Sequence, residues 1–244
     1  MRIIARLDIK NNYVIKGINL EGLRKVGDPK KLINKYYKNY IDELLIIDSV
    51  ASLYGRNNLF DLIKEITEDI FIPITLGGGI RSLSDIELAL NSGADKVAIN
   101  SKALECPSFI DDAVNKFGSS TIVCNIEAKK IEGPSSTWEP YKFCGRERTN
   151  INLSEWIKII HQKNCGEILL TSIDKEGTET GFDIELIDHV YKTINKPLII
   201  SGGCGSIDDI KDLKKKFSNM SVALASVLHY DKIKIKDIID NLNK

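Results

Sequence analysis

The sequence has no excess of charge of either sign and no long apolar run. Its 244 residues include 34 Lys and Arg and 34 Asp and Glu, so the formal net charge is zero. Domains that bind nucleic acid usually carry a basic excess, and the balance argues against that class. No apolar stretch approaches the roughly 18 residues that a membrane-spanning helix needs. We therefore expect neither nucleic acid nor a membrane as a partner.

Cysteine is also scarce, and its spacing excludes two common roles. The five residues are an odd number, contain no C-x-x-C pair and lie at Cys106, Cys124, Cys144, Cys165 and Cys204. A disulfide framework or a zinc site would need paired, closely spaced cysteines, so we expect no metal and no cofactor. Arg2 and Asp8 interrupt the apolar N-terminus where a signal peptide would be continuous. These features are typical of a cytoplasmic globular protein.

Short runs rich in β-branched residues recur along the chain between amphipathic stretches. Several runs are continuously apolar, as in strands of a parallel sheet covered on both faces. Helical spacing of apolar residues marks residues 84–91, 154–163 and 208–217. The predicted strands are residues 3–9, 44–48, 74–77, 96–100, 121–127, 168–172, 198–202 and 222–225. Eight strands alternating with about eight helices predict an α/β fold, the (β/α)8 TIM barrel, over an open doubly wound sheet.

The chain repeats itself at half its length. Residues 73–86 align with residues 197–210 without a gap, with identities that include Pro73/Pro197, Gly78/Gly202, Gly79/Gly203 and Ser82/Ser206. Residues 98–101 similarly match residues 223–226. The repeat predicts one barrel built from two similar half-barrels. No linker or shift in composition divides the chain, so we expect a single domain over residues 1–244.

Glycine pairs follow an apolar strand and precede a helix in both halves. Such turns let a backbone approach a ligand, and the N–H groups of the helix start favour phosphate, although a tight turn without a ligand is the alternative. Gly177 is expected to add backbone donors near the first pair. Two phosphate sites on opposite sides of a barrel mouth imply a bis-phosphorylated small-molecule substrate. The predicted phosphate-binding residues are Gly78, Gly79, Asn100, Ser101, Gly177, Ser201, Gly202, Gly203, Ala225 and Ser226.

Acidic residues end one predicted strand in each half. Asp8 ends the first strand and Glu127 ends the fifth, so both should face each other across the barrel mouth. That placement suits a general acid and a general base acting on one substrate, whereas an ordinary solvated or capping carboxylate is the alternative. Residues 130–150 form a long stretch after the fifth strand, either a lid over the mouth or a small satellite core around its aromatic residues.

Four charged residues of alternating sign start strands at the opposite end of the predicted barrel. They are Arg2, Glu43, Lys96 and Glu167. They could form a ring that plugs the lower opening, or they could be ordinary surface charge, and spacing alone does not choose between these interpretations.

Taken together, these residues resemble a known family over nearly the whole chain. The matching segments are residues 7–10, 14–17, 27–29, 41–44, 77–80, 93–100, 166–174 and 201–203. The chain resembles the cyclase subunit of imidazole glycerol phosphate synthase, the HisF-like family of histidine biosynthesis. The resemblance implies that a glutaminase docks at the N-terminal barrel face and that ammonia passes through the barrel. The substrate would be a bis-phosphorylated ribulosyl aminoimidazole carboxamide ribotide, and the products imidazole glycerol phosphate and an aminoimidazole carboxamide ribotide.

The resemblance also assigns the charged residues. Arg2, Glu43, Lys96 and Glu167 match the family's ammonia gate, and Asp95 matches a partner-interface position. The sister isomerase of the pathway shares the half-barrel repeat but uses no ammonia, so the gate argues against it. Asp8 and Glu127 match the two catalytic positions.

Four residues depart from the family pattern at the mouth. Glu127 and Glu176 replace aspartates, and Arg6 and Asn125 replace small residues. Arg6 shares the side-chain parity of Asp8 and should point into the barrel, where a buried guanidinium needs a partner. Glu127 is the candidate for that partner.

A second branch of the family supplies an alternative function. Residues 6–10, 20–24, 54–58 and 145–149 look like the branch associated with surface-polysaccharide synthesis. There the barrel would pass ammonia to a third, sugar-amidating protein that makes an acetamidino group. A non-catalytic scaffold that only activates the glutaminase is a further hypothesis.

Overall fold

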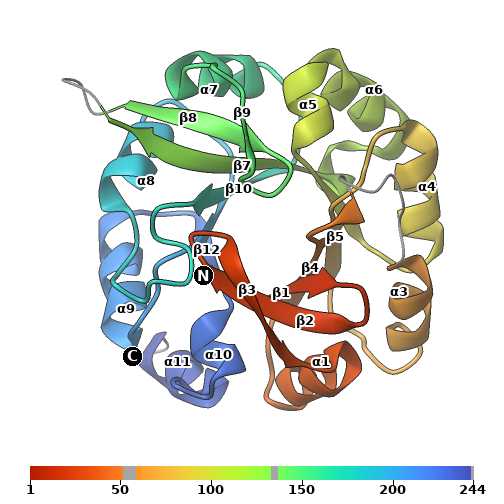
Figure 1. Ribbon diagram of the computed structural model, residues 1–244, viewed down its shortest axis with the longest axis vertical. Helices are drawn as coiled ribbons and strands as arrows, with labels where there is room; N and C mark the ends of the chain where they lie inside the picture. The colour runs from red at the N-terminus through yellow and green to blue at the C-terminus, as the bar shows by residue number, and fades with distance from the viewer. Residues whose placement is uncertain (52–58, 133–136, 243–244) are drawn as a thin grey trace.

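Eight parallel strands form a closed barrel in the computed structural model, which describes residues 1–51, 59–132 and 137–242. Each strand pairs with the next, and β1 closes the ring against β12 with Ile3 opposite Val222. The barrel strands are β1 (Ile3–Lys10), β4 (Glu43–Asp48), β5 (Ile74–Gly77), β6 (Lys96–Ile99), β7 (Ile122–Ile131), β10 (Glu167–Ser172), β11 (Leu198–Ser201) and β12 (Met220–Leu224). The predicted (β/α)8 barrel is confirmed (Figure 1).

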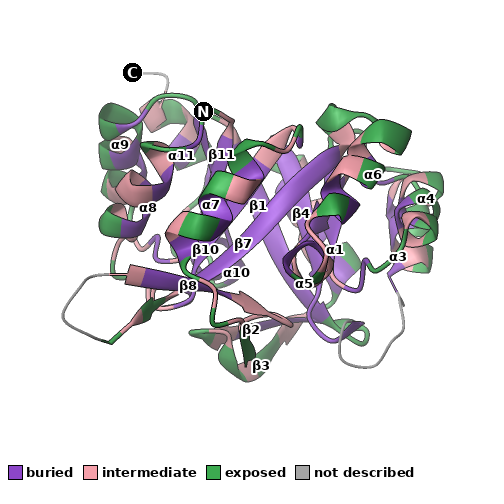
Figure 2. Ribbon diagram, turned by 90° about the horizontal axis from the view of Figure 1, so that it is seen from above, coloured by how far each residue is buried: buried purple, intermediate pink, exposed green. Residues whose placement is uncertain are grey.

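Helices surround the barrel and turn their apolar faces toward the strands (Figure 2). The longer ones are α1 (Pro29–Lys38), α3 (Phe60–Ile66), α4 (Leu83–Asn91), α6 (Ser108–Phe117), α7 (Leu153–His161), α8 (Ile184–Tyr191), α9 (Ile207–Lys216) and α11 (Ile235–Leu242). The shorter ones are α5 (Ser101–Glu105), α10 (Ser226–His229) and the 3-10 turn η1 (Ser119–Thr121). No helix among the described residues is long and apolar enough to cross a membrane.

The core has two layers, because each strand is buried on both faces. A large cluster fills the space between strands and helices. A smaller apolar cluster, the lumen layer, fills the barrel interior with Ile4, Leu45, Ile47, Ala98, Val123, Leu169, Ile199 and Ala223. The barrel is therefore packed rather than open, as is usual for this fold.

The sequence repeat is also a structural repeat. Ser82 begins α4 and Ser206 begins α9, each with a capping box. Gly78 and Gly202 both have positive φ, at 90° and 95°. A Cβ on Gly78 would lie 2.2 Å from the Asp48 carbonyl oxygen, and one on Gly202 would lie 2.8 Å from that of Ser172. Both turns thus require glycine for conformation and for close approach to the neighbouring strand.

Two antiparallel hairpins extend the barrel at its C-terminal mouth, and the sequence analysis had not predicted them as strands. β2 (Tyr13–Ile18) and β3 (Glu21–Gly27) follow β1, and β8 (Thr137–Lys142) and β9 (Glu147–Arg148) follow β7. Both cross the mouth in Figure 1. The second hairpin accounts for most of the stretch at 130–150, and within it Trp138 is 3% exposed and belongs to the main core.

Candidate functional site

The two predicted catalytic carboxyls both lie at the barrel mouth. Asp8 extends from β1 and Glu127 from β7, and their residues are only 6% and 2% exposed. Their surroundings differ in charge, and this difference determines what each carboxyl can do.

Asp8 is held by two cations. Arg6 Nε donates to Asp8 Oδ1 at 3.0 Å, and Lys16 Nζ lies 3.8 Å from Asp8 Oδ2. Lys16 also pairs with the buried Glu176. Burial alone would raise the pKa of Asp8, but the charges of Arg6 and Lys16 outweigh it and lower that pKa below its usual value.

Arg6 lies across the lumen, as its side-chain parity predicted, and it is 2% exposed. Its Nη1 donates to Thr171 Oγ1 at 2.9 Å and to Ser201 Oγ at 3.0 Å. The predicted partner, Glu127, lies near enough for its charge to act on the guanidinium, but the hydrogen-bonded ion pair is made with Asp8. Asp8 is two residues away on the same strand and the same face, so it reaches the guanidinium first.

Glu127 receives hydrogen bonds only from neutral donors among the described residues. Asn100 Nδ2 donates to its Oε2 at 2.9 Å, the Gly145 backbone N–H to the same oxygen at 3.0 Å, and Asn125 Nδ2 to its Oε1 at 3.4 Å. Burial raises the pKa of Glu127 and outweighs the nearby charge of Arg6, which acts to lower it, and the charge of Asp8 adds to the rise. An ionised Asp8 opposite a carboxyl that holds its proton more tightly is a suitable base and acid pair.

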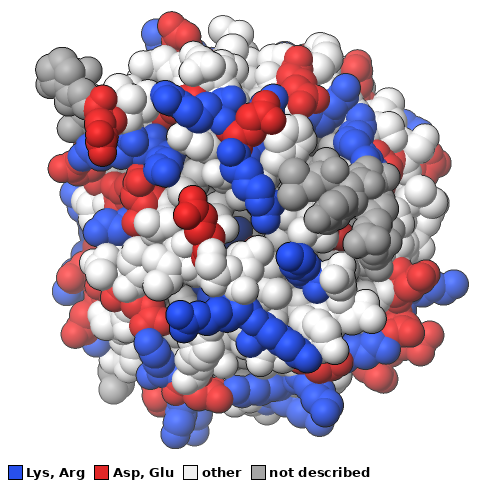
Figure 3. All heavy atoms as spheres, in the orientation of Figure 1, with Lys and Arg blue, Asp and Glu red and all other residues white. Residues whose placement is uncertain are grey.

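The first glycine turn opens onto a cavity of about 260 Å³. The cavity brings together four predicted phosphate residues and one predicted catalytic residue: Gly78, Gly79, Asn100, Ser101 and Glu127. Two cations, Arg81 and Lys102, and one further carboxylate, Glu105, also line it. Near the centre of this face, Lys and Arg side chains are more frequent than Asp and Glu (Figure 3). The cavity is thus suited to an anionic group.

The second glycine turn is nearly closed. A space of about 10 Å³ remains between the other predicted residues, which are Gly177, Ser201, Gly202, Gly203, Ala225 and Ser226. The expectation that Gly177 lies near the first pair was wrong. The backbone of Gly177 packs on the β2–β3 hairpin, where an added Cβ would lie 2.2 Å from the Gly17 carbonyl oxygen, and this holds the turn beside the second pair.

The tip of the β8–β9 hairpin contacts both the first glycine site and Glu127. Phe143 N donates to Ser101 Oγ at 3.0 Å, and Arg146 Nη1 donates to the Ser49 carbonyl oxygen at 3.0 Å. Together with the Gly145 N–H on Glu127, these bonds cover the mouth. These contacts agree with the interpretation of residues 130–150 as a lid over the mouth, while buried Trp138 agrees with the alternative of a satellite core.

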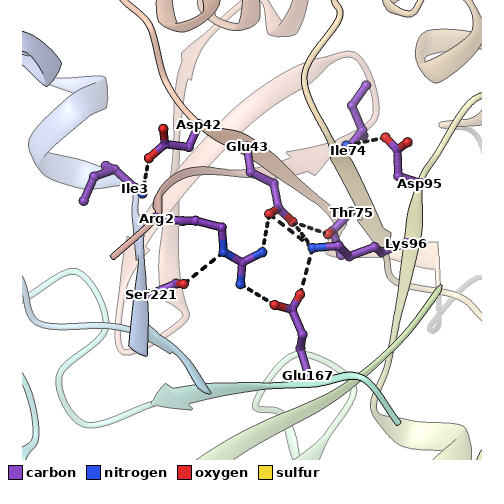
Figure 4. Close-up of polar contacts among 10 residues, drawn as sticks. All are labelled: Arg2, Ile3, Asp42, Glu43, Ile74, Thr75, Asp95, Lys96, Glu167 and Ser221. Atoms are coloured by element: carbon purple, nitrogen blue, oxygen red, sulfur yellow. Dashed lines mark hydrogen bonds and ion pairs between the residues drawn. The ribbon is translucent and has the colours of Figure 1, made fainter. Parts of the chain in front are cut away.

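The four charged residues at the N-terminal end form a closed ring (Figure 4). Arg2 Nη1 lies 2.8 Å from Glu43 Oε2, and Arg2 Nη2 pairs with Glu167. Lys96 Nζ completes the ring at 3.1 Å from Glu43 Oε1 and 2.8 Å from Glu167 Oε2. Burial raises the pKa of Glu167, but hydrogen bonds from Lys96 and Arg2 outweigh this and lower it. The ring lies below the lumen layer and closes it.

Asp95 lies outside this ring on the same end of the barrel. It is exposed, and its Oδ2 accepts a hydrogen bond from the Ile74 N–H at 2.8 Å. Asp42 caps the start of β1 in the same way, through the Ile3 N–H at 2.7 Å. A groove of about 550 Å³ beside the ring is lined in part by Arg2 and Glu167, so the ring borders a recessed surface.

Comparison with known proteins agrees with this architecture. The sequence pattern of the family described as "Histidine biosynthesis protein" matches residues 2–234, and the fold is thus a (β/α)8 barrel of the histidine biosynthesis class. Several relatives at 44–49% identity carry one name, "Imidazole glycerol phosphate synthase subunit HisF", and the chain belongs to this HisF family.

Three relatives illustrate the likeness. The HisF subunit of Lactococcus lactis subsp. cremoris (strain MG1363) is 44% identical over 243 residues, 100% of this chain and 93% of the relative. The HisF subunit of Legionella pneumophila is 49% identical over 209 residues, which are 86% of this chain and 98% of the relative. That of Hydrogenobaculum sp. (strain Y04AAS1) is 44% identical over 234 residues, 96% and 92%.

Proposed function

We propose that this chain is the cyclase subunit of an imidazole glycerol phosphate synthase. It would use ammonia from a glutaminase partner to convert a bis-phosphorylated ribulosyl aminoimidazole carboxamide ribotide into imidazole glycerol phosphate and an aminoimidazole carboxamide ribotide. The names of the relatives support the reaction. The observation that carries it in this chain is the pair of buried carboxyls, Asp8 and Glu127, between two glycine turns related by the half-barrel repeat.

The substrate would lie across the mouth with one phosphate at each turn. The first phosphate fits the open cavity, where Gly78, Gly79 and Ser101 lie beside Arg81 and Lys102. The second would bind Gly177, Ser201, Gly202, Gly203, Ala225 and Ser226. Because the space there is about 10 Å³, this turn and the β2–β3 hairpin have to separate when the substrate binds.

The two carboxyls would move protons during nitrogen transfer. Addition of ammonia to a substrate carbonyl requires removal of a proton from nitrogen and delivery of a proton to oxygen. Asp8, which Arg6 and Lys16 keep ionised, accepts the proton from nitrogen. Glu127, whose pKa is raised by burial, delivers the proton to oxygen.

Ammonia would enter from the opposite face, where the glutaminase docks. The gate consists of Arg2, Glu43, Lys96 and Glu167, and Asp95 lies on the exposed face around it. Above the gate, the packed side chains of the lumen layer are apolar, so a molecule that passes between them would be neutral ammonia rather than an ion.

Ammonia-dependent turnover of the purified chain tests this proposal without the partner. The assay supplies the bis-phosphorylated substrate at high pH with excess ammonium salt. We expect turnover by the wild-type chain and a loss of about 10²-fold or more in kcat for both Asp8→Asn and Glu127→Gln. Asp112→Asn, on the exposed surface of α6, is the matched control. A folded wild-type chain without turnover, or variants of unchanged rate, contradicts the proposal.

A second candidate is ammonia delivery to a third, sugar-amidating protein. It is favoured by the occupied mouth, where Arg6 binds Asp8 and Ser201 and the second turn is closed. Residues 54–58, part of the resemblance to that branch, lie outside the described residues. In this case the chain and its glutaminase would turn over the phosphorylated substrate only negligibly, and amidination would require the third protein.

A further inference from the structure

Two residues that line the open cavity each carry an amide oxygen that accepts no hydrogen bond from the part of the chain that the structure describes. Among the described residues, Asn100 Oδ1 and Asn125 Oδ1 are buried and accept no hydrogen bond. Asn125 as a whole is 7% exposed. A buried acceptor without a donor costs free energy, so both atoms point to a ligand that supplies N–H or O–H groups.

The orientation of both amides is fixed by Glu127. Asn100 Nδ2 donates to Glu127 Oε2 at 2.9 Å and to the Tyr141 carbonyl oxygen at 3.1 Å. Asn125 Nδ2 lies 3.4 Å from Glu127 Oε1. Reversing either amide would turn its oxygen toward another oxygen. The two Oδ1 atoms are therefore the ones left to accept from a ligand, and because both are closed to solvent here, a ligand reaches them when the surrounding side chains move.

Asn125 also marks where the lumen meets the cavity. It lies in β7 two residues after Val123 and two before Glu127, so all three side chains face the barrel interior. Val123 belongs to the lumen layer, and Ile47 and Ala98 of that layer line the cavity together with Asn125. Arg6 and Asp8 line a separate, smaller space on the other side of the mouth, and Cys144 borders both spaces.

We propose that Asn125, with Asn100, forms a receiving site for ammonia where it leaves the lumen. The inference rests on the proposed function and deepens it. Ammonia has three N–H groups and one lone pair, so two N–H groups bound to the amide oxygens leave the lone pair free to attack. The reacting carbonyl of the substrate would lie in the part of the cavity nearer Gly78 and Ser101.

Position and size favour ammonia over a substrate hydroxyl as the donor. Asn125 lies at the apolar end of the cavity, whereas the glycine turn and the basic side chains of Arg81 and Lys102 form the end that would bind an anion. A molecule of the size of water or ammonia needs about 10–15 Å³ of such a cavity. The remainder of the 260 Å³ is then left for the substrate.

The kinetic test compares the KM for ammonium with the KM for the phosphorylated substrate. We expect Asn125→Ala to raise KM for ammonium about three- to tenfold, as loss of one hydrogen bond predicts, and to change KM for the phosphorylated substrate less than twofold. Asn34→Ala, on α1 away from the mouth, is the matched control. A rise in KM for the phosphorylated substrate with an unchanged KM for ammonium overturns the proposal, because the oxygens would then bind substrate hydroxyls.

A binding measurement keeps the inference separate from the proposed function. The side-chain amide resonances of Asn100 and Asn125 in the wild-type chain are followed by NMR during titration with ammonium chloride at pH 9, with sodium chloride as the control. We expect a saturable shift with the ammonium salt alone. Equal shifts with both salts, or none, overturn the receiving site. A clear shift without turnover retains the site and rejects the cyclase reaction.

Discussion

Arg6 and Asp8 form a buried ion pair within a single strand, with Arg6 Nε 3.0 Å from Asp8 Oδ1. Alternate residues of β1 face the lumen, so the strand itself places the two side chains side by side. Burial raises the pKa of Asp8, and the charge of Arg6 is the largest of those that outweigh it. Thr171 and Ser201 fix the far end of the guanidinium.

Replacing the Arg6 guanidinium should shift the acid limb of the pH profile of kcat/KM. In Arg6→Met, Asp8 keeps only the more distant Lys16, so we expect its pKa to rise and the acid limb of the kcat/KM profile to move to higher pH. Loss of one partner from a buried pair should also lower the free energy of unfolding by about 3–5 kcal/mol. Arg24→Met, at an exposed position, serves as the control. An unmoved acid limb would show that Arg6 does not set the ionisation of Asp8.

The charged ring should couple the two reactions of the complex. In Lys96→Ala, Glu43 and Glu167 keep only Arg2 as a partner in the ring, so the closed arrangement is lost. We expect glutamine hydrolysis by the complex to exceed product formation, while turnover with added ammonium stays near that of the wild type. Lys116→Ala, which breaks an exposed pair with Glu87, should leave the ratio unchanged. A ratio of glutamine hydrolysis to product formation near one for Lys96→Ala would contradict the gate assignment.

Alanine substitutions at two glycines separate the cost of backbone strain from the cost of a close atomic contact. Gly78 and Gly118 have φ of 90° and 87°, but a Cβ on Gly118 would meet nothing within 4 Å. With ψ at 153°, Gly118 lies in a backbone region essentially restricted to glycine, so we expect Gly118→Ala to lower the free energy of unfolding by about 1–3 kcal/mol. Gly78→Ala adds a clash with Asp48 and should cost more and raise KM for the phosphorylated substrate. Urea denaturation and steady-state kinetics measure both effects, and equal losses for the two variants would argue against the close approach.

A buried histidine should make stability depend on pH. His229 is 6% exposed and its Nδ1 lies 2.6 Å from Tyr36 Oη. Burial, together with the charge of Lys16, lowers the pKa of His229 from 6.5 to about 4. Below pH 6.5 the unfolded chain therefore binds a proton that the folded chain does not, and stability falls as pH decreases.

The expected loss from this residue is about 2 kcal/mol between pH 8 and pH 5. Urea denaturation at the two pH values measures it. His229→Gln should reduce the difference by that amount, and His161→Gln, at an exposed position, should not. An identical pH dependence in the wild type and His229→Gln would contradict the assignment.

The barrel strands could be predicted because their chemistry is simple. Strands covered on both faces are continuously apolar, and the predicted residues 74–77 coincide with β5. The prediction of 121–127 was short, since β7 continues to Ile131 where it leaves the barrel and pairs with β8. The half-length repeat anticipated the matching glycine turns.

The hairpins could not be recognised from pattern alone. β3 is mostly exposed and rich in charge, and β8 contains Pro140, which is unfavourable in a strand. Their pairing with β2, β7 and β9 supplies what their own sequences do not. The position of Gly177 likewise depends on contact with Gly17, which is far away in sequence. The residues around Gly177 give no indication of this contact.

Closure of the barrel joins the first strand to the last, and this has a consequence during synthesis. Ile3 pairs with Val222, and Arg2 Nε donates to Ser221 Oγ across 219 positions of the chain. Until those late residues leave the ribosome, β1 presents an unpaired edge, open to other strands. Because such distant pairs form slowly, the nascent chain is most exposed to aggregation just before its last strand emerges.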